Sequence, residues 1–178
     1  MSRPVNFRDV GEALGLWLDP SPIPAGRLLR GGRMDLLTTP ADLGHPATIL
    51  NLRRGPDPTH LDGVRYLHIP AADDLENYET GLRRVRTWLS SGLKVLADPK
   101  TAWPVYVHCT SGRDRTGIVI AAALLLLEVP PAIVIEEYLL SDGAEPSSIR
   151  RAVEGILAGS GSLGVNPARL REGLLGRL

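Results

Sequence analysis

The chain has 178 residues, of which 43% are hydrophobic, so its length and composition predict one folded domain spanning residues 1–178. Its 20 basic residues balance 20 acidic ones, and this neutrality favours neither nucleic acid nor an acidic membrane as a partner. The longest apolar run, residues 118–127, is too short to cross a bilayer, and residues 1–9 lack the apolar core of a signal peptide. We therefore expect a soluble protein with no stable membrane insertion.

Prolines make the first part of the chain rich in loops, because proline removes a backbone donor and restricts the residue before it. Hydrophobic periodicity and capping residues then predict a series of short strands and helices. In chain order, we expect an edge strand at residues 28–30, a brief helix capped by Thr38 or Thr39 and ending at Leu43, strands at 48–52 and 64–69, a helix at 78–96, a strand at 104–108, and helices at 116–127, 131–141, 147–157 and 167–175. The last helix follows Asn166, a favourable N-cap.

Strands that alternate with helices predict an α/β fold with a central, mainly parallel sheet flanked by helices. In such sheets, ligands gather at the carboxyl ends of the strands. Arg53 follows the expected strand at 48–52, Asp73 and Asp74 follow the one at 64–69, and Cys109 follows the one at 104–108. If these three strands are parallel neighbours, the loops that follow them meet at one pocket.

The most informative segment is residues 108–117, which reads His-Cys-Thr-Ser-Gly-Arg-Asp-Arg-Thr-Gly. A loop of this length can wrap its backbone around a tetrahedral oxyanion so that successive N–H groups point inward, and a helix N-terminus behind it adds positive potential. Gly112 lets the loop turn without strain, and Arg115 brings a planar fork that can hold two phosphate oxygens. The residues expected to bind phosphate are Thr110, Ser111, Gly112, Arg113, Asp114 and Arg115.

Cys109, the chain's single cysteine, lies at the floor of this expected loop. The inward N–H groups and the arginine charge favour a thiolate, which can attack phosphorus and form a cysteinyl-phosphate that water later hydrolyses. Thr116 can donate its hydroxyl to the departing sulfur, and we expect His108 to fix the loop by hydrogen bonds to backbone groups. This chemistry needs no cofactor. The remaining histidines lack ligand spacing, so no metal is predicted.

The segment resembles the His-Cys-x5-Arg-Thr-Gly signature of the cysteine-dependent protein tyrosine and dual-specificity phosphatases. It is most similar to the HCxxGKDRTG-type loop of bacterial tyrosine phosphatases that also accept phosphoinositides. Residues 6–11, 26–31 and 137–141 agree with that subfamily, whereas Asn51 and Arg113 stand where it usually has aspartate and lysine. The resemblance implies a phosphatase-like fold and a protein-tyrosine-phosphatase, a phosphoric monoester hydrolase, or its dual-specificity variant.

Release of an alkoxide or phenolate from phosphate requires a proton donor, and the sequence offers three aspartates for this role. Asp73 is favoured, because its distance past the preceding strand resembles that of the general acid in dual-specificity phosphatases. Asp74 is the close competitor, and either residue could instead cap a turn or helix. Asp114, inside the loop, is the third candidate, since some relatives lack an aspartate that works from the mobile loop.

The expected partner is a phosphorylated protein or a phosphoinositide. Arg53 is a further candidate for substrate binding, and a solvated strand end explains it equally well. Two alternative functions stay open, namely a phosphoinositide phosphatase and a phosphate-binding module that has lost turnover. Because a lone cysteine forms no internal disulfide and a thiolate needs reducing surroundings, we expect a cytoplasmic location.

Overall fold

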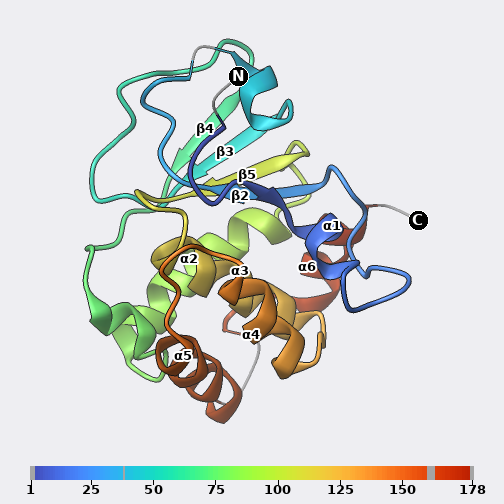
Figure 1. Ribbon diagram of the computed structural model, residues 1–178, viewed down its shortest axis with the longest axis vertical. Helices are drawn as coiled ribbons and strands as arrows, with labels where there is room; N and C mark the ends of the chain where they lie inside the picture. The colour runs from blue at the N-terminus through green and yellow to red at the C-terminus, as the bar shows by residue number, and fades with distance from the viewer. Residues whose placement is uncertain (1–2, 38, 160–162, 177–178) are drawn as a thin grey trace.

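A computed structural model describes residues 3–37, 39–159 and 163–176 of the protein. These residues form a five-stranded sheet in the order β1-β2-β5-β3-β4, with the longer helices gathered on one side of it (Figure 1). The strands are β1 (Arg8–Asp9), β2 (Leu28–Gly31), β3 (Thr48–Asn51), β4 (Arg65–His68) and β5 (Val105–His108). Strands β2, β5, β3 and β4 are parallel and β1 is antiparallel, so the predicted α/β fold with a mainly parallel sheet is confirmed.

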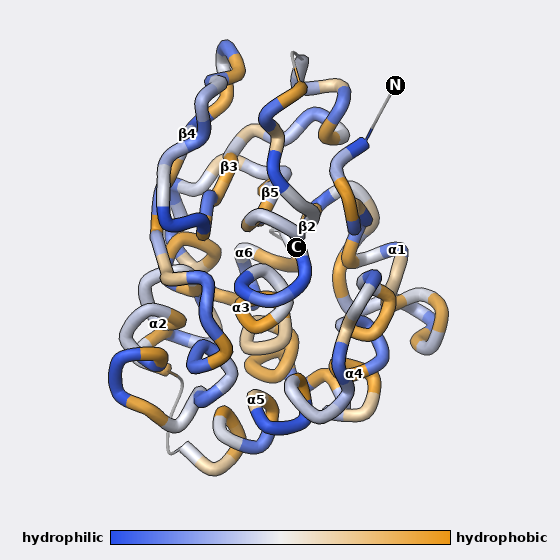
Figure 2. Tube along the Cα trace, turned by 60° about the vertical axis from the view of Figure 1, so that its left-hand side comes forward, coloured by the Kyte–Doolittle hydropathy of each residue, from blue (hydrophilic) through white to orange (hydrophobic). Residues whose placement is uncertain are grey.

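The central helix of the layer, α3, is hydrophobic along most of its length (Figure 2). It packs against α2, α4, α5 and α6, which explains why the sequence shows an apolar run here and not a one-sided stripe. The helices are α1 (Val10–Leu14), α2 (Arg83–Ala97), α3 (Asp114–Leu126), α4 (Pro131–Leu139), α5 (Pro146–Ala158) and α6 (Pro167–Leu175), with 3₁₀ turns η1 (Pro40–Leu43) and η2 (Leu75–Tyr78). None of the helices in the described ranges is long and apolar enough to span a bilayer.

Side chains of β5 alternate between two cores, because successive residues of a strand point to opposite faces of the sheet. Val105 and Val107 join the larger core beneath the helices, whereas Tyr106 joins a smaller cluster on the other face. His108 shares the face of Tyr106, and the two rings stack with centroids 5.4 Å apart. Cys109 belongs to the helical core. The strand thus places the histidine and the cysteine on opposite sides of the sheet.

The strand expected at residues 28–30 is confirmed as β2, but its expected place at the edge of the sheet is wrong, because β2 lies inside the sheet. It pairs with β1 on one side and with β5 on the other, and all four of its residues are buried. The two-residue strand β1, too short to leave a pattern in the sequence, covers the side that would otherwise be an edge. Asp9 then caps α1, a helix that the sequence did not indicate, by accepting from the N–H of Gly11 at 2.8 Å.

Helix α2 begins five residues later than expected, at Arg83. The intervening chain packs against α5, where the Thr80 hydroxyl donates to the carbonyl of Ala152 at 2.6 Å, and this tertiary contact overrides the helical periodicity. At η1, the carboxylate of Asp42 accepts from the N–H of Thr39 at 3.2 Å, in keeping with the expected cap. The alternative cap, Thr38, lies outside the described residues.

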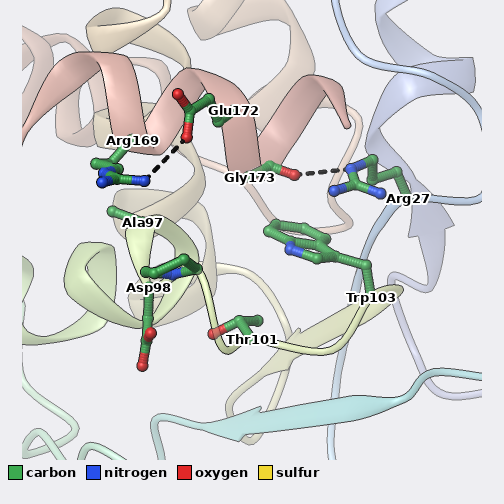
Figure 3. A pocket seen from close by; sticks show the side chains of 9 residues that line it. Arg27, Ala97, Asp98, Thr101, Trp103, Arg169, Glu172 and Gly173 are labelled. Atoms are coloured by element: carbon green, nitrogen blue, oxygen red, sulfur yellow. Dashed lines mark hydrogen bonds and ion pairs between the residues drawn. The ribbon is translucent and has the colours of Figure 1, made fainter. Parts of the chain in front are cut away.

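A pocket of about 170 Å³ lies at the amino-terminal ends of β2 and β5, at the edge of the sheet opposite to Cys109 (Figure 3). Arg27 precedes β2, and its guanidinium lies 4.5 Å from the ring centroid of Trp103, which precedes β5. The Nε of Arg27 donates to the carbonyl of Gly173 at 2.7 Å. These contacts tie α6 to the sheet.

Candidate active site

Three loops converge at the carboxyl edge of the sheet, as the sequence predicts for parallel neighbours. Cys109 follows β5 directly, and a loop, here called the 109–115 loop, runs from it into the first turn of α3. From the loop after β4, the carbonyl of Ala71 accepts from Arg115 at 3.1 Å. From the loop after β3, Asp57 contacts His108 at 2.8 Å. The three loops therefore meet at one edge of the sheet, as expected for strands that are parallel neighbours.

The carbonyl oxygens of Thr110, Ser111 and Gly112 are held outward by donors from other parts of the chain. The donors are the N–H of Arg33 at 3.0 Å, the side-chain amide of Asn6 at 2.9 Å and the guanidinium of Arg30 at 2.9 Å. A carbonyl and the N–H of the same trans peptide unit point in opposite directions, so the N–H groups of the loop face inward. Within the described ranges, no acceptor pairs with the N–H of Ser111 or Gly112. The loop therefore offers free, converging donors to an oxyanion.

Gly112 satisfies two separate requirements of this loop. Its φ is +70°, in the left-handed region that side chains disfavour. A Cβ at this position would also overlap the backbone of Gly31, the last residue of β2, and of Gly32, which follows it. The loop can thus lie against β2 only with glycine here.

The guanidinium of Arg115 lies beneath the loop with its side chain 3% exposed. One of its terminal nitrogens donates to Ala71, and the other donates to the hydroxyl of Thr110 at 3.1 Å and contacts Asp73 at 3.2 Å. Its Nε is buried and has no partner among the described residues. An unpaired buried donor is costly, so this nitrogen suits an anion bound in the loop.

The two aspartates after β4 differ in what they contact. Asp73 lies against Arg115 with 70% of its side chain exposed, at the open side of the site. Asp74 turns away and accepts from the N–H of Glu76 at 2.7 Å, which caps η2. The geometry favours Asp73 over Asp74 as the group next to a bound phosphate.

Asp114 is held by several donors. It accepts from the hydroxyl of Tyr78, and both of its oxygens accept from the guanidinium of Arg113, at 3.0 to 3.2 Å. Burial, together with the hydrogen bonds to Asp114 and Tyr138, raises the pKa of Tyr78 far above its ordinary value, so its hydroxyl stays protonated. Asp114 would have to leave these donors before reaching a leaving group.

A buried ion-pair cluster supports the loop from below. Glu137 of α4 accepts from Arg30 at 2.6 Å and from Arg8 at 2.8 Å, and the side chains of Arg30 and Glu137 are at most 1% exposed. Burial lowers the pKa of Arg30 to about 10, against the raising effect of Glu137, so the guanidinium remains charged at neutral pH. Its second terminal nitrogen donates to Gly112, which links α4 to the loop.

The other predicted site residues lie near the loop with different partners. Arg53 pairs with Asp35 at 2.8 Å and with Asp57 at 3.0 Å, both through the same terminal nitrogen, so this nitrogen is engaged by carboxylates. The guanidinium of Arg113 donates to the carboxylate of its neighbour Asp114 and to the carbonyl of Gly143. The hydroxyl of Thr116 is buried without a partner among the described residues.

Asp57 is the residue that sequence reasoning missed. It stands in a Gly-Pro-Asp-Pro stretch, which indicates an exposed turn, yet it is 4% exposed. Burial would raise the pKa of Asp57, but the hydrogen bonds and charges of His108 and Arg53 bring it below its ordinary value, so it is a carboxylate at neutral pH.

Comparison with known proteins agrees with this architecture. A model of the tyrosine phosphatase family matches residues 1–170. The triple specificity protein phosphatase PtpB of Mycobacterium tuberculosis is 32% identical over 78 residues, which are 44% of this chain and 25% of PtpB. The alignment therefore spans a quarter of the length of that relative.

Solved structures show the same fold at low sequence identity. The core catalytic domain of the PP-IP phosphatase SIW14 from S. cerevisiae superimposes with a TM-score of 0.61 at 16% identity, covering 85% of this chain and 86% of that one. TpbA of P. aeruginosa gives a TM-score of 0.57 at 19% identity, covering 87% and 88%. The resemblance to cysteine-dependent phosphatases is confirmed, and since the family match runs through almost the whole chain, the protein belongs to the tyrosine phosphatase family.

Proposed function

We propose that the protein is a metal-independent cysteine phosphatase that hydrolyses phosphomonoesters, with protein phosphotyrosine as its main substrate class. The observation that carries the proposal is the 109–115 loop, whose carbonyls are pulled outward and whose buried arginine keeps one unpaired nitrogen. The phosphate would be held by the loop N–H groups and Arg115, directly above the sulfur of Cys109. We assign Cys109 as nucleophile, Arg115 as phosphate clamp and Asp73 as general acid.

In the first step, the thiolate of Cys109 forms a sulfur–phosphorus bond while the bond from phosphorus to the leaving oxygen breaks. The leaving oxygen takes the electron pair and a proton from Asp73. In the second step, Asp73 removes a proton from water, whose oxygen binds phosphorus as the sulfur–phosphorus bond breaks. The electron pair returns to the sulfur, where the buried hydroxyl of Thr116 can donate a hydrogen bond.

The breadth of substrates is a finer part of the proposal. TpbA has been solved in complex with phosphotyrosine, and PtpB bears the name of a triple specificity phosphatase. By analogy we expect phosphotyrosine to be accepted, and a phosphoinositide is worth testing beside it. A catalytic thiolate is best preserved in a reducing compartment, so we also propose a cytoplasmic location.

The test is a panel of a phosphotyrosine peptide, a phosphoserine peptide and a water-soluble phosphoinositide, run on the wild type and on four variants. Cys109→Ser should abolish hydrolysis, and Asp73→Asn should lower kcat by roughly 100-fold, because a general acid contributes on this order. Asp74→Asn and Asp114→Asn should stay within several-fold of wild type. Full activity of Cys109→Ser would overturn the mechanism, and a collapse confined to Asp114→Asn would move the acid to that residue.

A further inference from the structure

The segment that carries the proposed general acid is tied to the active site at both of its ends. This segment, residues 71–78, is here called the acid segment, and it runs from the loop after β4 to the last residue of η2. At its start, the carbonyl of Ala71 accepts from Arg115 at 3.1 Å. At its end, the hydroxyl of Tyr78 donates to the carboxylate of Asp114, in the first turn of α3. Both ends therefore meet the chain that directly follows the nucleophile.

The middle of the acid segment is closed by two contacts within it. The buried side-chain amide of Asn77 donates to the carbonyl of Ala72 at 2.7 Å. Asp74 caps η2 by accepting from the N–H of Glu76 at 2.7 Å. Asp73 lies between Ala72 and Asn77, and most of its side chain is exposed. The backbone on either side of this carboxyl group is thus held, while the carboxyl group itself stays open to a substrate.

The contact at Tyr78 is part of a buried chain of hydroxyl groups. The rings of Tyr78 and Tyr138 meet edge to face with their centroids 6.3 Å apart, and both residues are buried. The hydroxyl of Tyr78 gives its proton to Asp114, so the hydrogen bond between the two tyrosines is donated by Tyr138. A buried hydroxyl is costly to leave unpaired. The chain of hydrogen bonds therefore favours one position of η2 against α3.

We propose that Tyr78 is a positioning residue that fixes the acid segment against the 109–115 loop, so that Asp73 stands in one place at the open side of the site. Asp114 is the acceptor of this link and not the acid. A proton donor acts only within hydrogen-bonding reach of the leaving oxygen, and a displacement of about an ångström removes much of its effect. The inference rests on the proposed role of Asp73 as general acid.

The leaving group of the substrate separates this role from a general loss of structure. 4-Nitrophenolate is a stable anion that departs with little help from an acid, whereas phenolate needs a proton. Tyr78→Phe keeps the ring and removes the donor. It should lower kcat/KM roughly tenfold for phenyl phosphate but less than about threefold for 4-nitrophenyl phosphate. This ratio of rates includes every step up to departure of the leaving oxygen, and an equal loss for both substrates would overturn the proposal.

Three further variants test the link itself. Tyr138→Phe removes a hydroxyl from the same buried chain and leaves the bond between Tyr78 and Asp114, so it should keep the wild-type preference between the two substrates. Asp114→Ala removes the acceptor and should reproduce the pattern of Tyr78→Phe. In an Asp73→Asn background, Tyr78→Phe should have little further effect on phenyl phosphate, because it acts through the acid. An undiminished further loss there would contradict the inference.

Hydrogen exchange measures the anchoring of the acid segment without any turnover. The N–H groups of Glu76 and Asn77 are bonded within the segment, so their exchange reports its opening. Tyr78→Phe should accelerate the exchange of a peptide covering residues 71–79 by at least about threefold, while peptides from α6 should exchange like wild type. Wild-type exchange of the acid segment in Tyr78→Phe would overturn the proposal.

The two measurements separate this inference from the proposed function. If exchange accelerates but the wild type hydrolyses no phosphomonoester, the proposed function fails and the anchoring by Tyr78 stands. If Asp73→Asn loses phenyl phosphate selectively while Tyr78→Phe behaves like wild type, the proposed function stands and the inference fails. If Asp114→Asn, which keeps an acceptor oxygen for Tyr78, loses phenyl phosphate selectively, the acid is Asp114 and the inference fails with the assignment of Asp73.

Discussion

Among single residues, Gly112 shows how two constraints meet at one position. Its positive φ makes any side chain unfavourable, and its contact with Gly31 leaves no space for a Cβ. The first constraint is local. The second comes from β2, a strand more than eighty residues earlier in the chain that lies against the loop. A substitution here therefore disturbs both the loop and its support.

Gly112→Ala should lower the hydrolytic activity by roughly 100-fold or more. Displacing the loop by about an ångström would misplace all of its N–H groups relative to a bound phosphate. Gly63→Ala is the matched control, because Gly63 has a φ of +74° and open space around it. That control should lose about 1 kcal/mol of stability from backbone strain and keep its activity. Steady-state kinetics and urea unfolding of both variants provide the measurement. Equal losses of activity would show that strain alone, and not the contact with β2, governs the loop.

Asp73 should also compete with a bound anion, because its carboxylate already contacts the guanidinium of Arg115. Asp73→Asn should bind tungstate about twofold to fivefold more tightly, the range that an exposed ion pair contributes, even though its turnover falls. Asp74→Asn makes the same charge change beside it without touching Arg115 and should bind tungstate like wild type. Calorimetric titration of the two variants decides the matter, and weaker binding by Asp73→Asn would refute competition for the guanidinium.

The sequence predicts the residues whose partners are close to them in the chain. It misses the residues whose partners are far away in the sequence. Cys109 and Arg115 can be predicted because both lie in one loop, at the spacing of the family signature. Asp57 is not, because its partner lies 51 positions away and its own neighbours indicate a turn. Arg53 was expected at the site, and the carboxylates that engage it, Asp35 and Asp57, become visible only once the strands are assembled.

At the scale of elements, α4 and β2 together support the 109–115 loop. Their connection is the pair of Glu137 and Arg30, both buried, and Arg30 carries the link on to Gly112. The sequence predicts both elements and the approximate ends of α4, since apolar periodicity is a local property. It places β2 at the edge of the sheet, because a two-residue partner such as β1 has no detectable pattern.

Glu137→Gln should lower the free energy of unfolding by roughly 3–5 kcal/mol, because it leaves buried arginine charge without its partner. Glu136→Gln, one position earlier on α4 and exposed, should change stability by less than about 0.5 kcal/mol. Urea denaturation followed by circular dichroism measures both. A loss below about 1 kcal/mol in Glu137→Gln would mean that Arg8 and Arg30 find other compensation.

For the whole molecule, the proposed anion site lies where three strand ends meet, so occupancy of the site should stabilise the fold. Tungstate at about one hundred times its Kd should add about 2.7 kcal/mol, seen as a rise in Tm. Arg115→Ala should abolish the rise, whereas Arg169→Ala, at the pocket on the opposite edge of the sheet, should leave it intact. A rise that survives Arg115→Ala would place the anion elsewhere.

Acid should destabilise the protein through Asp57. Its pKa is below the ordinary value, so the carboxylate contributes stability above about pH 4, and this contribution is lost as the pH falls through the pKa of the folded state. Wild type should therefore exceed Asp57→Asn in stability at neutral pH, and the difference should close below about pH 4. Urea midpoints across this range provide the measurement, and a pH-independent difference would argue against a charged Asp57.

The contact between Glu137 and Arg30 also bears on the order in which a new chain becomes competent. During synthesis, β2 and the 109–115 loop leave the ribosome before α4 does. A nascent chain that ends within α3 already carries Cys109 and Arg115, but it lacks the carboxylate that neutralises the buried guanidinium beneath the loop. Completion of α4 is thus the event after which the loop that begins at Cys109 can be held by its buried support.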